Sequence, residues 1–510
     1  MDIRVLDPAT AVVRGSVAPR RAAYVANRLL WRHAAPAPTD GAEIGPPRVL
    51  PAEATDALAK LGWRASPTPP EERTAQREFD AVAPQPTTSR VTPLDLAPIG
   101  DTLTSPPDAW VALQHIAAAS PEVAESLELD HIVAPIPYWD SIPYWDSIPY
   151  WDSIPYWDSI GAGASEFARP GSGGKMPVSV VMADPALTAT VPARPPVVVM
   201  PDTGIGRHPW FPRADGDARM IAAVPGSVVV TGSPISDDEP GVSDPLLGSL
   251  DRIAGHGTFI AGIVRQKCPA ARLVAHSVVR SDGYLLESEL LGLLDQLLTQ
   301  QRAAIAARDP AGIIDVLSLS LGYYHEKPDD QLTDTTVAQV MRDLGEAGVL
   351  VVAGAGNDAT TRPMLPAGLA GQVTGLRRTA LPLVSVGALN PNNATVCLFS
   401  NAGTWVTTYR TGGAVVSTLP DQQNAAAQPT LEAADVSPDT RPRATIDRDD
   451  FSGGLGVWSG TSFAAPVLAG ELAQALIDIG TDDITADGLV DRGWQAIDAV
   501  LGGALARPVA

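Results

Sequence analysis

The sequence is poor in cysteine and in basic residues. Only Cys268 and Cys397 are present, more than a hundred residues apart, which excludes a disulfide framework and the paired cysteine spacing of a metal site and leaves two free thiols. Lysine and arginine total 36 against 58 acidic residues, for a net charge of -22. Because phosphate attraction needs a surplus of cations, this balance argues against nucleic acid or an anionic membrane as a partner.

Long apolar runs are also missing. No stretch reaches the roughly eighteen apolar residues of a membrane span, and the first thirty residues carry charges where a signal peptide would be apolar. We therefore expect a cytoplasmic protein. Its 510 residues exceed one core, so we expect two domains, or one large domain with long appendages.

The N-terminal region, residues 1–135, mixes proline-rich polar stretches with short apolar patterns of helical period. These patterns predict helices at 21–31, 52–63 and 109–119. We expect a mostly helical or irregular region of unknown role, and we find no clear β-α-β-β-α-β pattern in it. His33, His115 and His131 are scattered along it, which favours surface or core histidines over ligands.

Residues 136–160 contain the hexapeptide Ile-Pro-Tyr-Trp-Asp-Ser four times in succession, closed by Ile160. Proline at every sixth position excludes an ordinary helix. One interpretation is a surface loop lengthened by replication; the other is an aromatic strip that docks a protein partner or the remainder of the chain. Residues 161–196 are rich in glycine, proline and serine, as is typical of a linker.

Strand and helix patterns alternate after Pro196. This alternation predicts an α/β fold whose mainly parallel, doubly wound sheet is flanked by helices. In such sheets functional groups collect beyond the carboxyl ends of the strands, where Asp202 and Asn357 would fall. The predicted strands are 197–200, 227–231, 272–279, 313–320, 348–353 and 383–388, and the predicted helices are 257–266, 287–307, 334–346 and 462–478.

Three short motifs in this part supply the groups of a nucleophilic site. Ser462 lies in Gly-Thr-Ser-Phe-Ala-Ala-Pro at the predicted start of a helix, His256 lies in Gly-His-Gly-Thr, and Asp202 in Asp-Thr-Gly. A serine hydroxyl needs a base to take its proton, and that base needs a carboxylate to fix its tautomer. The developing oxyanion needs donors, for which we expect Asn357 and the Ser462 amide.

These motifs resemble those of subtilisin-like serine peptidases, the subtilase family (peptidase family S8). The matching stretches are D-T-G at 202–204, G-H-G-T at 255–258, S-L-G at 320–322, A-G-N at 355–357, F-S-N at 399–401 and G-T-S-F-A-A-P at 460–466. The order Asp, His, Ser is also that of subtilisin. The resemblance places the peptidase domain at 197–510. The sequence departs from the family pattern at Pro201, which precedes Asp202, and in an acidic insertion at 420–457.

The resemblance implies how substrate would be held. A peptide would pair as an extra strand beside one segment, while a second segment would line the pocket for the residue before the cut. The first comprises Ser318, Leu319, Ser320, Leu321 and Gly322, and the second Ala353, Gly354, Ala355 and Gly356. The small residues of the second segment favour a bulky apolar side chain in that pocket.

We expect no cofactor for the chemistry itself. The resemblance raises calcium as a bound ion, for which Asp237, Asp238 and Glu239 with Asp244 are the candidates. Their spacing does not match an EF-hand loop, which favours a solvated acidic loop instead.

The leading functional hypothesis is a serine endopeptidase that acts on a protein or peptide. A catalytically silent protein that presents the same groove as a binding module is the alternative from another class. A peptidase dedicated to one precursor is the narrower alternative. Residues 1–195 would regulate the enzyme or recruit substrates, and the N-terminal part is also a candidate for an inhibitory prosegment.

Overall fold

A computed structural model gives the fold. It describes residues 2–13, 18–32, 50–68, 90–100, 105–135, 175–211, 228–231, 236–242, 246, 248–279, 283–370, 379–425, 429, 431–433, 442–480 and 483–502. The hexapeptide repeat and the first part of the expected linker, 161–174, lie outside these residues, so the docking interpretation of the repeat stays a prediction.

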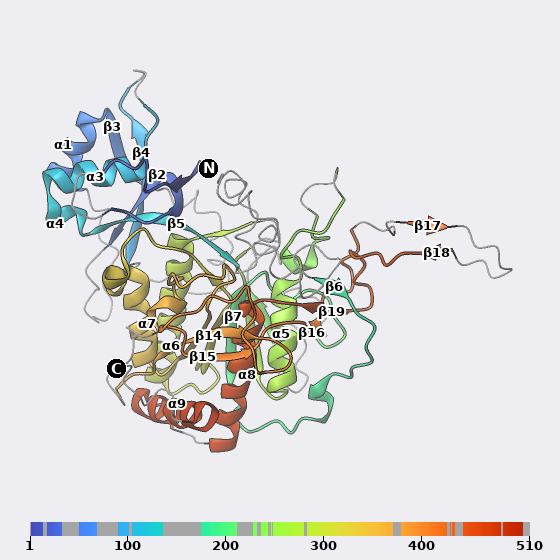
Figure 1. The fold of residues 1–510 in the computed structure, drawn as a ribbon. Helices are drawn as coiled ribbons and strands as arrows, with labels where there is room; N and C mark the ends of the chain where they lie inside the picture. Colours follow the sequence, from blue (N-terminus) through green and yellow to red (C-terminus); the bar gives the residue numbers. More distant parts are fainter. Residues whose placement is uncertain are drawn as a thin grey trace.

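A parallel sheet of seven strands forms the centre of the molecule, in the order β15-β14-β13-β11-β7-β9-β8 (Figure 1). The parallel sheet predicted from the sequence is confirmed, and β15 is a strand that the pattern did not predict. The strands are β7 (Val197–Asp202), β8 (Val228–Thr231), β9 (Arg272–Ser277), β11 (Val316–Leu319), β13 (Leu350–Gly354), β14 (Leu383–Leu389) and β15 (Thr408–Thr411).

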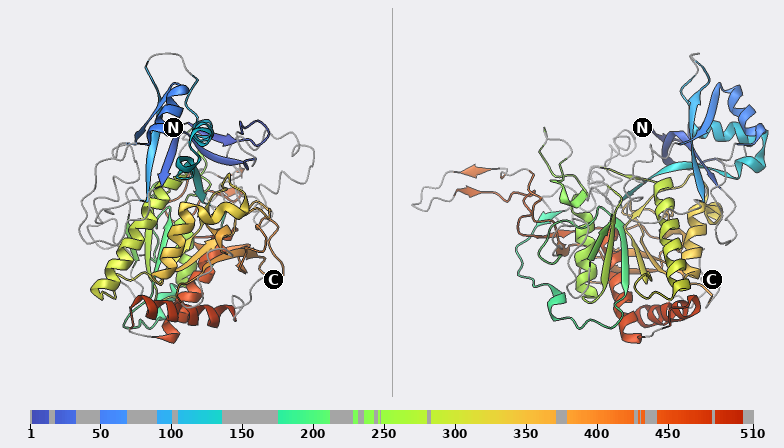
Figure 2. Two further views of the ribbon diagram at one scale, coloured as in Figure 1. Left: turned by 90° about the vertical axis from the view of Figure 1, so that its left-hand side faces the viewer. Right: turned by 180° about the vertical axis from the view of Figure 1, so that it is seen from behind.

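Helices cover both faces of this sheet (Figure 2). Alternate side chains of β7 enter two separate cores, with Val198 and Met200 packed among residues of α5 and α8, and Val197 and Val199 among residues of α6 and α7. Helix α8 is apolar enough to span a membrane, but 72% of its apolar window is buried inside the molecule, as expected of a core helix. The helices are α5 (His256–Lys267), α6 (Glu287–Ala307), α7 (Thr336–Glu346), α8 (Thr461–Ile479) and α9 (Ala486–Leu501).

Smaller elements complete this domain. β6 (Met176–Pro177) pairs with β19 (Leu455–Trp458), which also pairs with β16 (Val415–Thr418). The described part of the expected linker is thus held against the peptidase domain. Within the insertion, a hairpin of β17 (Glu432–Ala433) and β18 (Arg443–Ala444) projects away from the body (Figure 1). Short 3-10 helices are η5 (Pro185–Thr188), η6 (Ser236–Asp238), η7 (Asp329–Asp334) and η8 (Ala367–Leu369).

The N-terminal region differs from the mostly helical or irregular segment that we expected. Its described elements follow in the order β1, β2, α1, β3, β4, α3, α4, β5. The strands form an antiparallel sheet in the order β5-β2-β4-β3, with β1 beside β2. The β-α-β-β-α-β pattern is therefore present. The elements are β1 (Ile3–Leu6), β2 (Ala22–Arg32), α1 (Ala52–Lys60), β3 (Trp63–Pro67), β4 (Val91–Pro98), α3 (Ala109–Ala119), α4 (Pro121–Ala124) and β5 (Leu127–Pro135).

Burial on both faces explains why β2 was mistaken for a helix. Tyr24 and Leu29 pack with α1 and α3, whereas Val25 and Leu30 belong to the core of the peptidase domain. A strand covered on both sides loses the apolar–polar alternation by which strands are recognised. The helices predicted at 52–63 and 109–119 are confirmed as α1 and α3, with α1 ending at Lys60.

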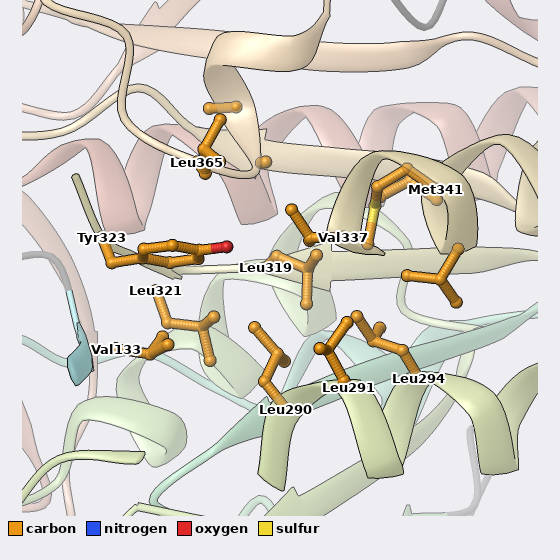
Figure 3. Packing of buried hydrophobic residues seen from close by; sticks show 14 of the residues in the cluster. Val133, Leu290, Leu291, Leu294, Leu319, Leu321, Tyr323, Val337, Met341 and Leu365 are labelled. Carbon is orange, nitrogen blue, oxygen red and sulfur yellow. The ribbon is translucent and has the colours of Figure 1, made fainter. Parts of the chain in front are cut away.

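Strand β5 joins the two domains. Its last residues pair antiparallel with β10 (Leu285–Leu286) and with β12 (Leu321–Gly322) of the peptidase domain. Figure 3 shows Val133 of β5 beside Leu290 of α6 and Leu321, within one apolar cluster. The N-terminal sheet is therefore packed into the peptidase domain rather than tethered to it.

Candidate active site

Asp202 and His256 meet at the carboxyl end of the central sheet. Asp202 ends β7 and His256 begins α5, and both side chains are buried. His256 Nδ1 lies 2.8 and 2.9 Å from the two carboxylate oxygens of Asp202. In the tautomer whose Nδ1–H donates to this carboxylate, Nε2 of the neutral ring carries the lone pair. Among the described residues, His256 Nε2 is a buried atom without a hydrogen-bond partner.

The backbone around this pair is closely packed. Thr203 N donates to Asp202 Oδ1 over 2.8 Å, and Gly257 N donates to Thr203 Oγ1 over 2.8 Å. A Cβ on Gly257 would lie 2.2 Å from the carbonyl oxygen of Gly204, so only glycine allows α5 to approach the Asp-Thr-Gly turn this closely. Pro201 does not end the strand, since β7 stays paired with β9 as far as Asp202.

Asp237 is a site residue whose role the sequence did not reveal. Its buried carboxylate accepts hydrogen bonds from Gly255 N (3.0 Å), Thr258 N (2.9 Å) and Thr258 Oγ1 (2.5 Å). These amides are at the beginning of α5, where Gly255 offers no side chain to cap them. Burial raises the pKa of Asp237 to about 6. Asp237 thus holds the start of the helix that carries His256.

Ser462 is the second residue of α8. The ring of the next residue, Phe463, has its centroid 5.4 Å from that of His256. Ser462 Oγ donates to the carbonyl of Ser320 over 3.4 Å, and Ser320 Oγ donates to the Ser462 carbonyl over 2.8 Å. The structure thus brings Asp202 and His256 into contact and gives the serine hydroxyl a different partner from His256 Nε2.

Asn357 lies next to the start of α8. Its Oδ1 accepts hydrogen bonds from Thr461 N (2.9 Å) and Thr461 Oγ1 (3.0 Å). Thr461 Oγ1 in turn accepts from Gly356 N over 3.0 Å. With Oδ1 bound to Thr461, the Nδ2 group is the remaining donor of the Asn357 side chain. Thr461 is a second residue that sequence reasoning missed, although it lies inside the Gly-Thr-Ser motif.

The predicted substrate-binding residues fall into three structural settings. Ser318 and Leu319 are inside the parallel sheet in β11, and Ser320 contacts Ser462. Leu321 and Gly322 form β12, whose partner is β5 of the N-terminal region. Ala353 and Gly354 end β13, and Ala355 and Gly356 follow it.

Asn401 organises the turn after β13. Its Nδ2 donates to Ala355 O over 3.0 Å, and its Oδ1 accepts from Asp358 N over 3.0 Å. Gly356 has a φ of +109°, and a Cβ there would lie 2.2 Å from Asn401 Nδ2. The F-S-N motif pointed to this residue without giving its role.

Lys175 is a buried lysine linked to His256 through the ring of Trp458. Its Nζ donates to Ala254 O over 2.7 Å and lies 4.8 Å from the ring centroid of Trp458. The Trp458 ring in turn meets that of His256 edge-on, with centroids 5.5 Å apart. Burial lowers the pKa of Lys175 to about 8. This lysine fixes the carbonyl groups of the loop that leads into α5.

The calcium candidates gain no support from the position of Asp237. Both of its carboxylate oxygens already accept hydrogen bonds from α5 and its cap. Asp244 lies outside the described residues, so calcium binding stays a prediction.

Comparisons with known proteins identify the family of the chain. The subtilase family model (Peptidase_S8) matches residues 195–483, more than half of the chain. In a comparison with curated proteins, no protein matches this chain.

Similar solved structures include a cold-adapted subtilisin-like serine proteinase, at 17% identity and a TM-score of 0.34, covering 64% of this chain and 88% of that one. Fervidolysin from Fervidobacterium pennivorans, a keratinolytic enzyme related to subtilisin, is 16% identical with a TM-score of 0.42, over 89% of this chain and 55% of that one. A lanthipeptide protease is 15% identical with a TM-score of 0.36, over 60% and 87%. The extent of the family match, over a parallel sheet that holds Asp202 against His256, means that this chain belongs to the subtilase family of serine peptidases.

Proposed function

We propose that the chain is a serine endopeptidase that uses Asp202, His256 and Ser462 as its catalytic triad. The observation that carries this proposal is the 2.8 Å contact between Asp202 and His256 Nδ1, which leaves Nε2 as a buried acceptor without a partner in the described structure. A general base needs such a free nitrogen. To give its proton to His256 Nε2, the Ser462 hydroxyl would have to rotate away from Ser320 O.

The chemistry follows from these positions. Ser462 Oγ would bond to the substrate carbonyl carbon as its proton passes to His256 Nε2, and Asp202 would stabilise the imidazolium. Asn357 Nδ2 and the Ser462 amide would donate to the oxyanion. His256 would then give the proton to the leaving amine, and water would hydrolyse the acyl-enzyme by the same steps in reverse.

A serine-directed probe tests this proposal. We expect a fluorophosphonate to label the folded chain and Ser462→Ala to abolish both labelling and casein turnover. Ser452→Ala, a change at an exposed serine in the same part of the chain, is the matched control and should keep both. Folded protein that resists the probe at neutral pH would instead support the silent binding module.

We also propose that the N-terminal region acts as a prosegment that blocks the substrate edge. The pairing of β5 with β12 supports this, because Leu321 and Gly322 are residues expected to pair with substrate. The pairing is antiparallel, with Pro135 opposite Leu321 and Ala134 opposite Gly322, so β5 runs toward Ser320 and therefore toward Ser462. An extended segment at a strand edge is how a peptide substrate binds.

Mass spectrometry of the purified chain tests the prosegment role. We expect the wild-type protein to cut itself between residues 136 and 174, Ser462→Ala to remain whole, and turnover to rise after the cut. A wild-type chain that stays intact and is fully active on casein would reject the role. Cleavage profiles on a peptide library would then separate a dedicated processing peptidase from a general one.

A further inference from the structure

A group of buried metal-ligating side chains lies where the two domains meet. His131 comes from β5 of the N-terminal region, whereas His325 and Glu326 follow β12 of the peptidase domain, and one ligand atom from each lies within 4.8 Å of the other two. The three side chains are 0%, 3% and 4% exposed. The site chemistry proposed above uses none of them.

His131 is held as a metal-binding histidine would be. Its Nδ1 lies 2.5 Å from Glu287 Oε2 at the start of α6, and the hydroxyl of Tyr323 donates to the other oxygen of Glu287. A carboxylate on one ring nitrogen fixes the tautomer and leaves the other nitrogen as the ligand, which is the usual outer-shell arrangement around zinc. The Nε2 atom left in this way faces Glu326 Oε2 at 2.6 Å.

His325 brings a second nitrogen to the same oxygen. Its Nδ1 is 3.0 Å from Glu326 Oε2 and accepts a hydrogen bond from Lys327 N over 3.1 Å. Nδ1 is thus engaged by the Lys327 amide and lies against Glu326. His325 Nε2 is buried without a hydrogen-bond partner among the described residues.

The kind of donors selects the kind of ion. Two imidazole nitrogens and one carboxylate oxygen suit zinc and its neighbours among the transition metals. Calcium takes six to eight oxygen ligands and does not match this set. A divalent cation would also offset the two buried carboxylates, Glu287 and Glu326, that approach His131.

We propose that His131, His325 and Glu326 form a zinc site that fastens the N-terminal sheet to the peptidase domain, with Glu287 orienting His131. The ligands come from segments almost two hundred residues apart in sequence, so zinc binds only while β5 is docked. By linkage, zinc strengthens that docking as much as docking strengthens zinc binding.

Zinc titration of the full-length chain tests the site. The chain would carry Ser462→Ala so that it stays whole, which also makes the result independent of peptidase activity. After treatment with a chelator, zinc is added in competition with a chromogenic chelator. We expect one zinc ion per chain, at least about 100-fold weaker binding in His131→Gln, and about 10-fold to 100-fold weaker binding in Glu287→Gln. His115→Gln, at a histidine on α3 outside the cluster, should bind zinc like the parent.

Two further measurements keep the outcome decisive. Circular dichroism shows whether each variant folds, and Glu326→Gln replaces His131→Gln if the latter does not. Cobalt(II) substitution should give the visible absorption bands of a nitrogen- and oxygen-ligated ion in the parent and not in His131→Gln. Three results would each overturn the proposal: no stoichiometric zinc, equal zinc affinity in His131→Gln and the parent, or calcium binding in place of zinc. The three side chains would then form a buried hydrogen-bonded cluster without a metal.

Discussion

Replacing Asp237 by alanine is the sharpest test of how the site is held. The carboxylate accepts three buried hydrogen bonds at the beginning of α5, two from backbone amides and one from a hydroxyl. In Asp237→Ala the amides of Gly255 and Thr258 lose their acceptor. A buried donor without a partner costs about 1–3 kcal/mol, so we expect the free energy of unfolding to fall by about 4 kcal/mol.

The same change should impair catalysis. His256 is the first residue of α5, so loosening this turn moves the proposed base, and small misplacements of a catalytic group are costly. We expect kcat to fall at least about 10-fold with KM changed far less. Unfolding by denaturant would be followed in the Ser462→Ala background, and kcat in the otherwise wild-type chain.

Asp238→Ala is the matched control for this prediction. Asp238 is the adjacent carboxylate and is only partly buried, so its loss should cost less than about 1 kcal/mol. If Asp237→Ala were as stable and as active as Asp238→Ala, the capping role assigned to Asp237 would be wrong.

Three other predictions concern the oxyanion, the domain interface and pH. Asn357→Ala should lower kcat about 10²–10³-fold with little change in KM, and an unchanged kcat in steady-state kinetics would remove Asn357 from the mechanism. Arg90, in the N-terminal region, bridges Asp295 and Asp343 of the peptidase domain. Arg90→Met should remove the partner of Asp295, leave Asp343 with Arg302 alone, and speed proteolysis of residues 1–135 in Ser462→Ala, whereas exposed Arg64→Met should not. Burial lowers the pKa of Lys175 to about 8, so its stabilising contribution is present above the ordinary lysine pKa and is lost as pH falls through 8. The stability of the wild type relative to Lys175→Met should therefore rise by about 1 kcal/mol from pH 8 to pH 9, and a pH-independent difference would contradict this.

The sequence predicted the peptidase domain well because its signals are local. Helix α6 was predicted at 287–307 and has those bounds, and the motifs identified Asp202 and His256, which the structure places in contact. Short motifs around glycine and serine report turns and helix starts, which depend on neighbours in the chain.

Local sequence signals could not predict contacts between segments that are distant in the chain. Asp237 caps a helix that begins nineteen residues later, and nothing in its own neighbourhood marks this role. His131 appeared as an ordinary histidine, because Glu287 and Glu326 meet it only after the domains have packed. The prediction of a helix at 21–31 was wrong for the same reason. The second apolar face of β2 packs against the peptidase domain, which lies far along the chain.

If the N-terminal region is a prosegment, the docking of β5 would separate cleavage of the chain from release of the fragment. If peptide-bond hydrolysis occurred beyond Pro135, the fragment would still hold two backbone ladders, the Arg90 bridges and an apolar face shared with the larger piece. Such a nicked protein would be a tight two-chain complex with its groove still filled. Liberation of the enzyme would then await a slower second event, dissociation or digestion of the fragment, and that event would set the time course of activity.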